Sequence, residues 1–158
     1  MTRNTTSIMP LNSESTGIIV VDHGSSVAES NALLERIAKS FQEQSSYKIV
    51  EAAHMELAEP SIATAFTRCV EQGAELVVVS PFFLLPGKHW SKDIPDLTRA
   101  AAVGHAGVRF LVTAPLGLHP ALLDVINAQV RQCLAHAFGE DAACELCSDN
   151  EKCQFEGG

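Results

Sequence analysis

The sequence of 158 residues lacks the long apolar run that a membrane span requires. Its longest apolar stretch, residues 76–85, contains Ser80 and Pro81 and reaches about half of the roughly 20 residues that cross a bilayer. Residues 1–16 are rich in Ser, Thr and Asn and have no apolar segment of the kind found in secretory signals. We therefore expect no membrane span and a disordered arm over residues 1–16.

Basic residues are also scarce, with 11 Lys and Arg against 19 Asp and Glu and a formal net charge of −8. This sign disfavours a nucleic acid or an anionic membrane as a partner. The charge is uneven, because residues 139–158 hold six acids and one lysine. The excess of acid therefore belongs chiefly to the C-terminal segment, and a polyanionic substrate is compatible with the rest of the chain.

Motifs for nucleotide binding and for common hydrolases are absent. The chain has no Gly-x-x-x-x-Gly-Lys-Ser/Thr, no Gly-x-Gly-x-x-Gly after a strand, no His-Glu-x-x-His and no Gly-x-Ser-x-Gly. We therefore expect no nucleotide cofactor. Asp22, His23 and Ser25 are residue types of a hydrolytic triad, but neighbours on one turn seldom reach the required relay geometry.

The chain does contain β-branched segments that alternate with amphipathic ones. Strands are predicted over 17–22, 47–53, 75–80 and 108–112, and helices over 28–44, 60–73, 93–103 and 120–137. Ser25 or Ser26 is expected to open the first helix and Pro60 the second, with a loop over 81–90. This order predicts an α/β fold, a four-stranded parallel sheet with helices on both faces. We expect one domain over 17–138 and a tail over 139–158.

Four histidines follow predicted strands, where ligands bind in such sheets: His23, His54, His89 and His119. His23 precedes Gly24, and His89 lies in Pro-Gly-Lys-His-Trp. Two neutral imidazoles that converge would form a site for Fe²⁺, Co²⁺, Ni²⁺ or Zn²⁺, completed by water or substrate. The alternatives are that Asp22 and His23 cap the next helix and that His89 is a solvent-exposed loop residue.

Two further residues near this edge have open roles. Glu56 could be a ligand or a proton acceptor, or a plain surface acid. His54 points to the same side as Glu56 if the strand continues that far. His119 precedes Pro120, which favours a role at the start of the last helix.

Three motifs follow the first three strands in order. They are Asp-His-Gly-Ser-Ser at 22–26, Ala-His-Met-Glu-Leu-Ala-Glu-Pro-Ser at 53–61, and Val-Val-Val-Ser-Pro-Phe-Phe-Leu-Leu-Pro-Gly-Lys-His-Trp at 77–90, the last followed by Asp93-Ile-Pro95. From Gly17 to about Ala137 the chain resembles the short sirohydrochlorin chelatases, the SirB and CbiX type of class II chelatase. Short members are similar to one half of the long two-domain chelatases and work as homodimers.

The resemblance implies insertion of Fe²⁺ or Co²⁺ into sirohydrochlorin without ATP, a lyase reaction. His23 and His89 match the metal-binding, catalytic histidines, and Glu56 matches the motif glutamate, a proton acceptor or secondary ligand. Lys88, Lys92 and Ser25 are candidates for binding the substrate, whose carboxylates suit lysine, although surface lysines often only aid solubility. The leading expectation is a ferrochelatase that makes sirohaem. The alternatives are a cobaltochelatase of cobalamin biosynthesis, a non-catalytic metallochaperone, and an iron–sulfur redox protein.

Four of the five cysteines lie in the last 26 residues: Cys133, Cys144, Cys147 and Cys153. Without a secretory signal, disulfides are a poor expectation, so a 2Fe–2S cluster, Zn²⁺ or redox thiols are the alternatives. The tail resembles the C-terminus of plant-type sirohydrochlorin ferrochelatases, which carry a 2Fe–2S cluster. Cys69 is expected to be a buried apolar residue. We expect a cytoplasmic protein, or a protein of the plastid stroma if the chain is a mature organellar form.

Overall fold

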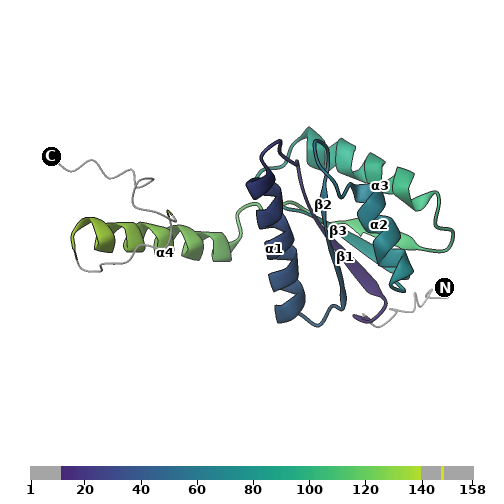
Figure 1. The fold of residues 1–158 in the computed structure, drawn as a ribbon, viewed down its shortest axis with the longest axis horizontal. Helices are drawn as coiled ribbons and strands as arrows, with labels where there is room; N and C mark the ends of the chain where they lie inside the picture. The colour runs from purple at the N-terminus through teal and green to yellow at the C-terminus, as the bar shows by residue number, and fades with distance from the viewer. Residues whose placement is uncertain (1–11, 140–146, 148–158) are drawn as a thin grey trace, which may run out of the picture. The chain divides into compact units, whose positions relative to one another are not determined.

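The computed structural model describes residues 12–139 and Cys147, and strands and helices alternate along it (Figure 1). The elements are β1(Thr16–Asp22), α1(Ala28–Gln44), β2(Ile49–His54), α2(Ile62–Glu71), β3(Leu76–Pro81), η1(His89–Asp93), α3(Ile94–Ala102), β4(Arg109–Val112) and α4(Pro120–Ala137). The chain divides after Gly117 into two compact units, of which the first holds the sheet and the second holds α4. The division falls inside the range 17–138 that the sequence suggests as one domain.

The four strands form one parallel sheet in the order β2–β1–β3–β4. β1 is paired along both edges, with Val20 opposite Ala52 on β2 and Ser80 on β3. All but the last residue of β1 are buried, as its β-branched run indicates. The strand order reverses between β1 and β3, because the chain passes from β1 to β2 on one side and from β3 to β4 on the other. Ligands bind at the carboxyl ends of strands beside such a reversal.

Helices cover both faces of the sheet, as predicted (Figure 1). On one face, Leu34 and Ala38 of α1 pack against alternate residues of the strands: Ile18, Val20 and Ala52. On the other face, α2 and α3 contribute Phe66 and Ile94 to the larger cluster, which includes Ile19, Val21, Val77 and Val79. Successive residues of a strand point to opposite faces, so one continuous apolar run can supply both clusters.

α1 spans Ala28–Gln44, as predicted, but the residues that cap the first two helices differ from those that the sequence predicts. The N-cap of α1 is Val27, without a side-chain cap, so Ser25, Ser26, Asp22 and His23 do not cap this helix. The N-cap of α2 is Ser61, whose Oγ accepts from the amide of Thr64 at 3.2 Å, so Pro60 precedes the helix. A hydroxyl at the N-cap satisfies an amide that would otherwise lack a partner, which outweighs the tolerance for proline in the first turn.

The predicted loop after β3 ends earlier, at Lys88. Residues His89–Asp93 form one π-helical turn, η1, which runs directly into α3. Trp90 anchors this turn, because its Nε1–H donates to the carbonyl oxygen of Thr113 at 2.8 Å. His89 is therefore the first residue of a helical turn and not part of a loop. π-Helical turns occur frequently at functional sites.

Cys69 of α2 is fully buried, as predicted. A Cβ on Gly17 would lie 2.9 Å from the Cβ of Cys69, so the glycine at the start of β1 lets α2 approach the sheet closely. Burial, together with the nearby charge of Glu51, raises the pKa of the Cys69 thiol to about 12. This thiol is therefore neutral at physiological pH.

The predicted arm and tail are described only in part. β1 begins at Thr16, one residue before the predicted strand, and Asn12 accepts hydrogen bonds from Glu14, Ser15 and Thr16 in a turn before it. Residues 1–11, 140–146 and 148–158 lie outside the described part of the chain. Within the described part, no helix combines the length and apolarity needed to cross a membrane.

Candidate active site at the carboxyl ends of the strands

Three predicted site residues come together at the carboxyl ends of β1, β2 and β3. His23 follows β1, Glu56 lies two residues past β2, and His89 opens η1. The imidazole rings of His23 and His89 lie edge to face, with centroids 5.2 Å apart. Nε2 of His23 lies 2.6 Å from Oε1 of Glu56. All three side chains are about half exposed, so the cluster is open to a ligand.

Backbone hydrogen bonds fix the pairing of His23 with Glu56. The amide of Met55 donates to the carbonyl oxygen of Asp22 at 2.8 Å, and the amide of Glu56 donates to that of His23 at 3.0 Å. The contact between β1 and β2 thus continues into the site. Gly24 is required here, because it has φ +88° and a Cβ would overlap the carbonyl oxygen of Glu56. The side chains of His23 and Glu56 are both carried by paired backbone, which holds their geometry.

The contacts of His23 define where its hydrogens lie. Nδ1 is 3.2 Å from the carbonyl oxygen of Gly24, which only accepts, so Nδ1 carries a hydrogen. The short contact between Nε2 and Glu56 also requires a hydrogen between the two atoms. A cation that binds Nε2 must replace that proton. A cation that bound at Nε2 would therefore release a proton.

Asp93 orients His89 from four residues further along the same helical segment. Nδ1 of His89 lies 2.9 Å from Oδ2 of Asp93, so the ring donates through Nδ1 and keeps the Nε2 lone pair for a ligand. Carboxylates commonly support metal-binding imidazoles in this way. Asp93 has no predicted role beyond its place in the third motif. The i,i+4 spacing indicates the contact only if the helical segment begins at His89.

A pocket of about 370 Å³ opens beside the cluster, lined by Met55, Glu56, His89, Asp93, Asp96 and Leu97. Its three carboxyl groups favour the approach of a divalent cation. Within the described ranges 12–139 and 147, no group of three or more His, Cys, Asp and Glu side chains is placed to hold a metal ion. The two imidazoles could therefore offer only partial coordination, which suits a cation whose shell is completed by water or another ligand.

The predicted substrate-binding residues are Lys88, Lys92 and Ser25, and the last two already have hydrogen-bond partners within the chain. Nζ of Lys92 lies 2.7 Å from Oδ2 of Asp96, a hydrogen bond that raises the pKa of Lys92 and lowers that of Asp96. Oγ of Ser25 accepts from the amide of Val27 at 3.0 Å. Lys88 is exposed and, among the residues that the structure describes, forms no ion pair. Of the two predicted lysines, only Lys92 therefore has a carboxylate partner in the described part of the chain.

His54, His105 and His119 lie outside the cluster of His23, His89 and Glu56. His54 lies at the carboxyl end of β2, the edge that the sequence predicts, but it is fully buried there. His119 is the N-cap of α4 in the second unit, where Nδ1 accepts from the amide of Ala121 at 3.2 Å, in agreement with its predicted place at a helix start. His105 pairs with Thr67 and stacks on Phe66 at the opposite end of the sheet.

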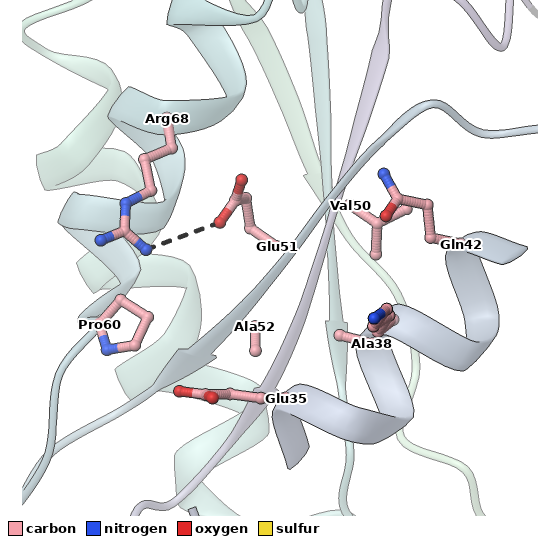
Figure 2. A pocket seen from close by; sticks show the side chains of 9 residues that line it. Glu35, Ala38, Gln42, Val50, Glu51, Ala52, Pro60 and Arg68 are labelled. Atoms are coloured by element: carbon pink, nitrogen blue, oxygen red, sulfur yellow. Dashed lines mark ion pairs between the residues drawn. The ribbon is translucent and has the colours of Figure 1, made fainter. Parts of the chain in front are cut away.

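A second pocket, of about 310 Å³, runs along β2 between α1 and α2 (Figure 2). It is lined by Glu35, Ala38, Lys39, Gln42, Val50, Glu51, Ala52, Pro60 and Arg68. Figure 2 shows Arg68 reaching toward Glu51, and the two form an ion pair at 3.7 Å. Glu51 also accepts from Gln72 at 2.7 Å. No predicted site residue lines this pocket, so it is separate from the candidate active site.

The structure describes two of the four predicted cluster cysteines. Cys133 is an exposed residue of α4, and Cys147 is half-buried. Cys144 and Cys153 lie outside the described residues. The four-thiolate site stays a prediction.

The chain is similar to proteins of known activity. It is 55% identical over 139 residues to the chloroplastic sirohydrochlorin ferrochelatase of Arabidopsis thaliana, which covers 88% of this chain and 62% of that protein. It is 30% identical over 119 residues to the sirohydrochlorin cobaltochelatase of Priestia megaterium, covering 75% of this chain and 39% of that protein. The chain thus spans only part of the length of these relatives.

Solved structures share the fold. A CbiX protein from Marinobacter aquaeolei matches with a TM-score of 0.66 and 35% identity, over 77% of this chain and 98% of that one. The sirohydrochlorin chelatase SirB from Bacillus subtilis, solved in complex with cobalt, matches with a TM-score of 0.70 and 28% identity, over 74% of this chain and 50% of that one. The CbiX family model matches residues 17–133. The chain therefore belongs to the CbiX family.

Proposed function

We propose that this protein is a sirohydrochlorin ferrochelatase, which inserts Fe²⁺ into sirohydrochlorin and forms sirohaem without ATP. The observation that carries this proposal is the cluster of His23, His89 and Glu56, in which two imidazoles and a carboxylate meet at an open edge. The 55% identity to the ferrochelatase of A. thaliana, over 88% of the chain, supports Fe²⁺ as the cation.

The reaction replaces two pyrrole N–H hydrogens of the macrocycle by one divalent cation and releases two protons. Nε2 of His89 and Nε2 of His23 would hold the cation while water leaves its shell. Glu56, 2.6 Å from His23, would accept protons in turn. No nucleotide is needed, because the nitrogens of the macrocycle form the stronger ligand set. Lys88 would contact a substrate carboxylate.

The test is an anaerobic assay with purified full-length protein, sirohydrochlorin and Fe²⁺. Loss of the absorbance of the free macrocycle measures the rate of insertion, and the uncatalysed reaction is the reference. We expect a clear acceleration that His23→Ala and His89→Ala each depress strongly. A rate equal to the uncatalysed one, with Fe²⁺ and with Co²⁺, would refute a chelatase function and leave a metallochaperone or a redox protein.

Cobalt is the second candidate cation, because several relatives of this chain, among them the one from P. megaterium, are named cobaltochelatases. Two imidazoles do not select between Fe²⁺ and Co²⁺ by ligand type. The same assay with both cations at equal concentration identifies the metallated product from its spectrum. A preference for cobalt would assign the protein to cobalamin biosynthesis.

For the C-terminal cysteines we propose a 2Fe–2S cluster held by Cys133, Cys144, Cys147 and Cys153, with Zn²⁺ as the alternative. Four thiolates match the ligand count of such a cluster. Assays for iron and acid-labile sulfide on anaerobically prepared protein distinguish the two. Zinc without sulfide would identify the alternative, and neither metal would indicate redox thiols.

We further propose that the chain acts as a homodimer, as the short chelatases that it resembles do. Light scattering after size-exclusion chromatography gives the mass, and a mass near the 16.9 kDa of one chain would refute the dimer.

The plastid stroma is the proposed compartment, supported over the cytoplasm by the chloroplastic relative. A fluorescent fusion expressed from the protein's own gene locates the protein in the cell. Fluorescence in the cytoplasm would favour the alternative.

A further inference from the structure

The buried histidine at the end of β2 is not used by the proposed chelation chemistry. His54 is fully buried, and its Nδ1 lies 2.6 Å from Oδ1 of Asp22. Its other ring nitrogen, Nε2, is also buried and has no hydrogen-bond partner among the residues that the structure describes. Leaving a buried polar atom without a partner destabilises the fold, because the atom loses its hydrogen bonds to water and gains none in return. An apolar side chain at position 54 would avoid this loss of stability. The buried histidine is therefore explained best by its contact with Asp22.

Asp22 links His54 to the candidate active site. Its Oδ1 accepts from the amide of Gly24 at 2.9 Å as well as from Nδ1–H of His54. The bond to Gly24 closes a turn around His23, which lies between the two residues. The side chain of Asp22 is one quarter exposed. Without His54, water can therefore compete for its carboxylate and release the turn.

The same turn sets the position of the His23 ring. Nδ1 of His23 donates to the carbonyl oxygen of Gly24 at 3.2 Å, so movement of Gly24 moves the imidazole. The amide of Glu56 donates to the carbonyl oxygen of His23, which ties the second strand to the same turn. Contacts therefore run without a gap from His54 through Asp22 and Gly24 to the 2.6 Å pair of His23 and Glu56.

We propose that His54 and Asp22 are positioning residues for the cation site. The buried imidazole donates the hydrogen bond that holds the carboxylate of Asp22, the carboxylate holds the turn, and the turn aims Nε2 of His23 at the cation. Neither residue binds the cation itself. This inference rests on the proposed function in one respect, which is that His23 is the cation ligand. Removing partners that orient a metal ligand typically lowers metal affinity about 10–100-fold.

The test is a calorimetric titration of the full-length protein with Co²⁺ and no tetrapyrrole. The component of binding that His23→Ala abolishes defines the site and excludes Co²⁺ held by the cysteines. His54→Leu, which has no donor, should raise the dissociation constant of that component about tenfold or more. His54→Asn, whose amide can donate to Asp22, should stay within about threefold of the wild type.

His105→Leu is the matched control. His105 also has one side-chain hydrogen bond, to Thr67 at 3.0 Å, but lies before β4 at the other end of the sheet. It should leave Co²⁺ affinity unchanged. The thermal unfolding of both variants shows how much stability is lost with the hydrogen bond of His105 and with that of His54.

An unchanged Co²⁺ dissociation constant in folded His54→Leu would overturn the proposal. If circular dichroism shows that this variant does not fold, Asp22→Ala replaces it, since the Asp22 side chain is partly exposed. It should show the same loss, and Asp22→Asn, which still accepts, should retain most affinity. Unchanged affinity in Asp22→Ala would equally overturn the proposal.

Turnover provides a second readout. In the insertion assay, His54→Leu should lower kcat about tenfold and leave KM for sirohydrochlorin within about twofold, because the cation site and not the macrocycle site is disturbed. A wild-type protein that binds Co²⁺ through His23 but does not metallate sirohydrochlorin would refute the proposed function alone. The positioning role would then still be decided by the titration.

Discussion

The two histidines of the candidate site are held in different ways. His23 is held by the contact between β1 and β2, through the backbone hydrogen bonds that Met55 and Glu56 donate. These bonds join residues that are more than 30 positions apart in the chain. His89 is held within one helical segment, by Asp93 four residues later. The same chemical group is thus oriented once by sheet register and once by local helix geometry. The position of His23 should therefore be lost only when the sheet unfolds. The position of His89 should be lost whenever its own helical segment opens.

The largest effect is expected from removing either imidazole. His23→Ala and His89→Ala should each lower kcat/KM for metal insertion about 100-fold or more, in the range of loss of a residue that handles protons or cations in the transition state. Steady-state kinetics in the anaerobic assay measure this, with His105→Ala as the control. Nearly full activity in both variants would place the cation elsewhere, and loss in only one would make the two histidines unequal.

Gly24→Ala tests the long-range side of the comparison. The φ of +88° alone costs about 1–2 kcal/mol for an L side chain, and the new Cβ would overlap the carbonyl oxygen of Glu56. We expect a loss of stability of about 2 kcal/mol or more and a fall in activity of about tenfold or more, measured by denaturant unfolding and by the insertion assay.

Gly73→Ala is the matched control for that variant. Gly73 also has a positive φ, +101°, but a Cβ there would meet no atom within 4 Å. Gly73→Ala should lose stability because of its positive φ, but it should keep the activity of the wild type. Equal activities of the two variants would mean that the contact of Gly24 with Glu56 is not needed for the site.

Asp93→Ala tests the local side. It removes the acceptor that orients His89, so activity should fall about tenfold while the unfolding free energy stays within about 0.5 kcal/mol. Asp93→Asn, whose amide oxygen still accepts, should recover most of the activity. A large loss of stability in Asp93→Ala would show that η1 is as tightly coupled to the fold as the β1–β2 contact.

The smallest effects are expected from the lysines beside His89. Lys88→Met should raise KM for sirohydrochlorin about two- to fivefold, because an exposed charge contributes modestly to binding a carboxylate. Lys92→Met should raise it less, since Lys92 is already paired with Asp96. The difference should shrink at high salt, where exposed charges are screened. A larger effect at Lys92 would mean that its pair with Asp96 opens when substrate binds.

The sequence allowed the fold to be predicted because its signals are local. The β-branched run of β1 and the apolar spacing of α1 identify both elements within one or two residues, and chain order alone brings His23 and His89 to one edge. The start of η1 at His89 was not predicted, since it depends on the contact of Trp90 with Thr113, 23 residues later. The contact of His54 with Asp22 depends on sheet register, which no single segment indicates.

The close packing of α2 on β1 has a consequence for thiol chemistry. Cys69 is fully buried and its pKa is raised to about 12, so it carries almost no nucleophilic thiolate at neutral pH. Alkylating reagents should therefore reach it only when the first unit opens. The rate at which the reagent labels Cys69, followed by mass spectrometry of the peptide that contains it, would therefore measure how often the sheet opens, at a residue that the chain already contains.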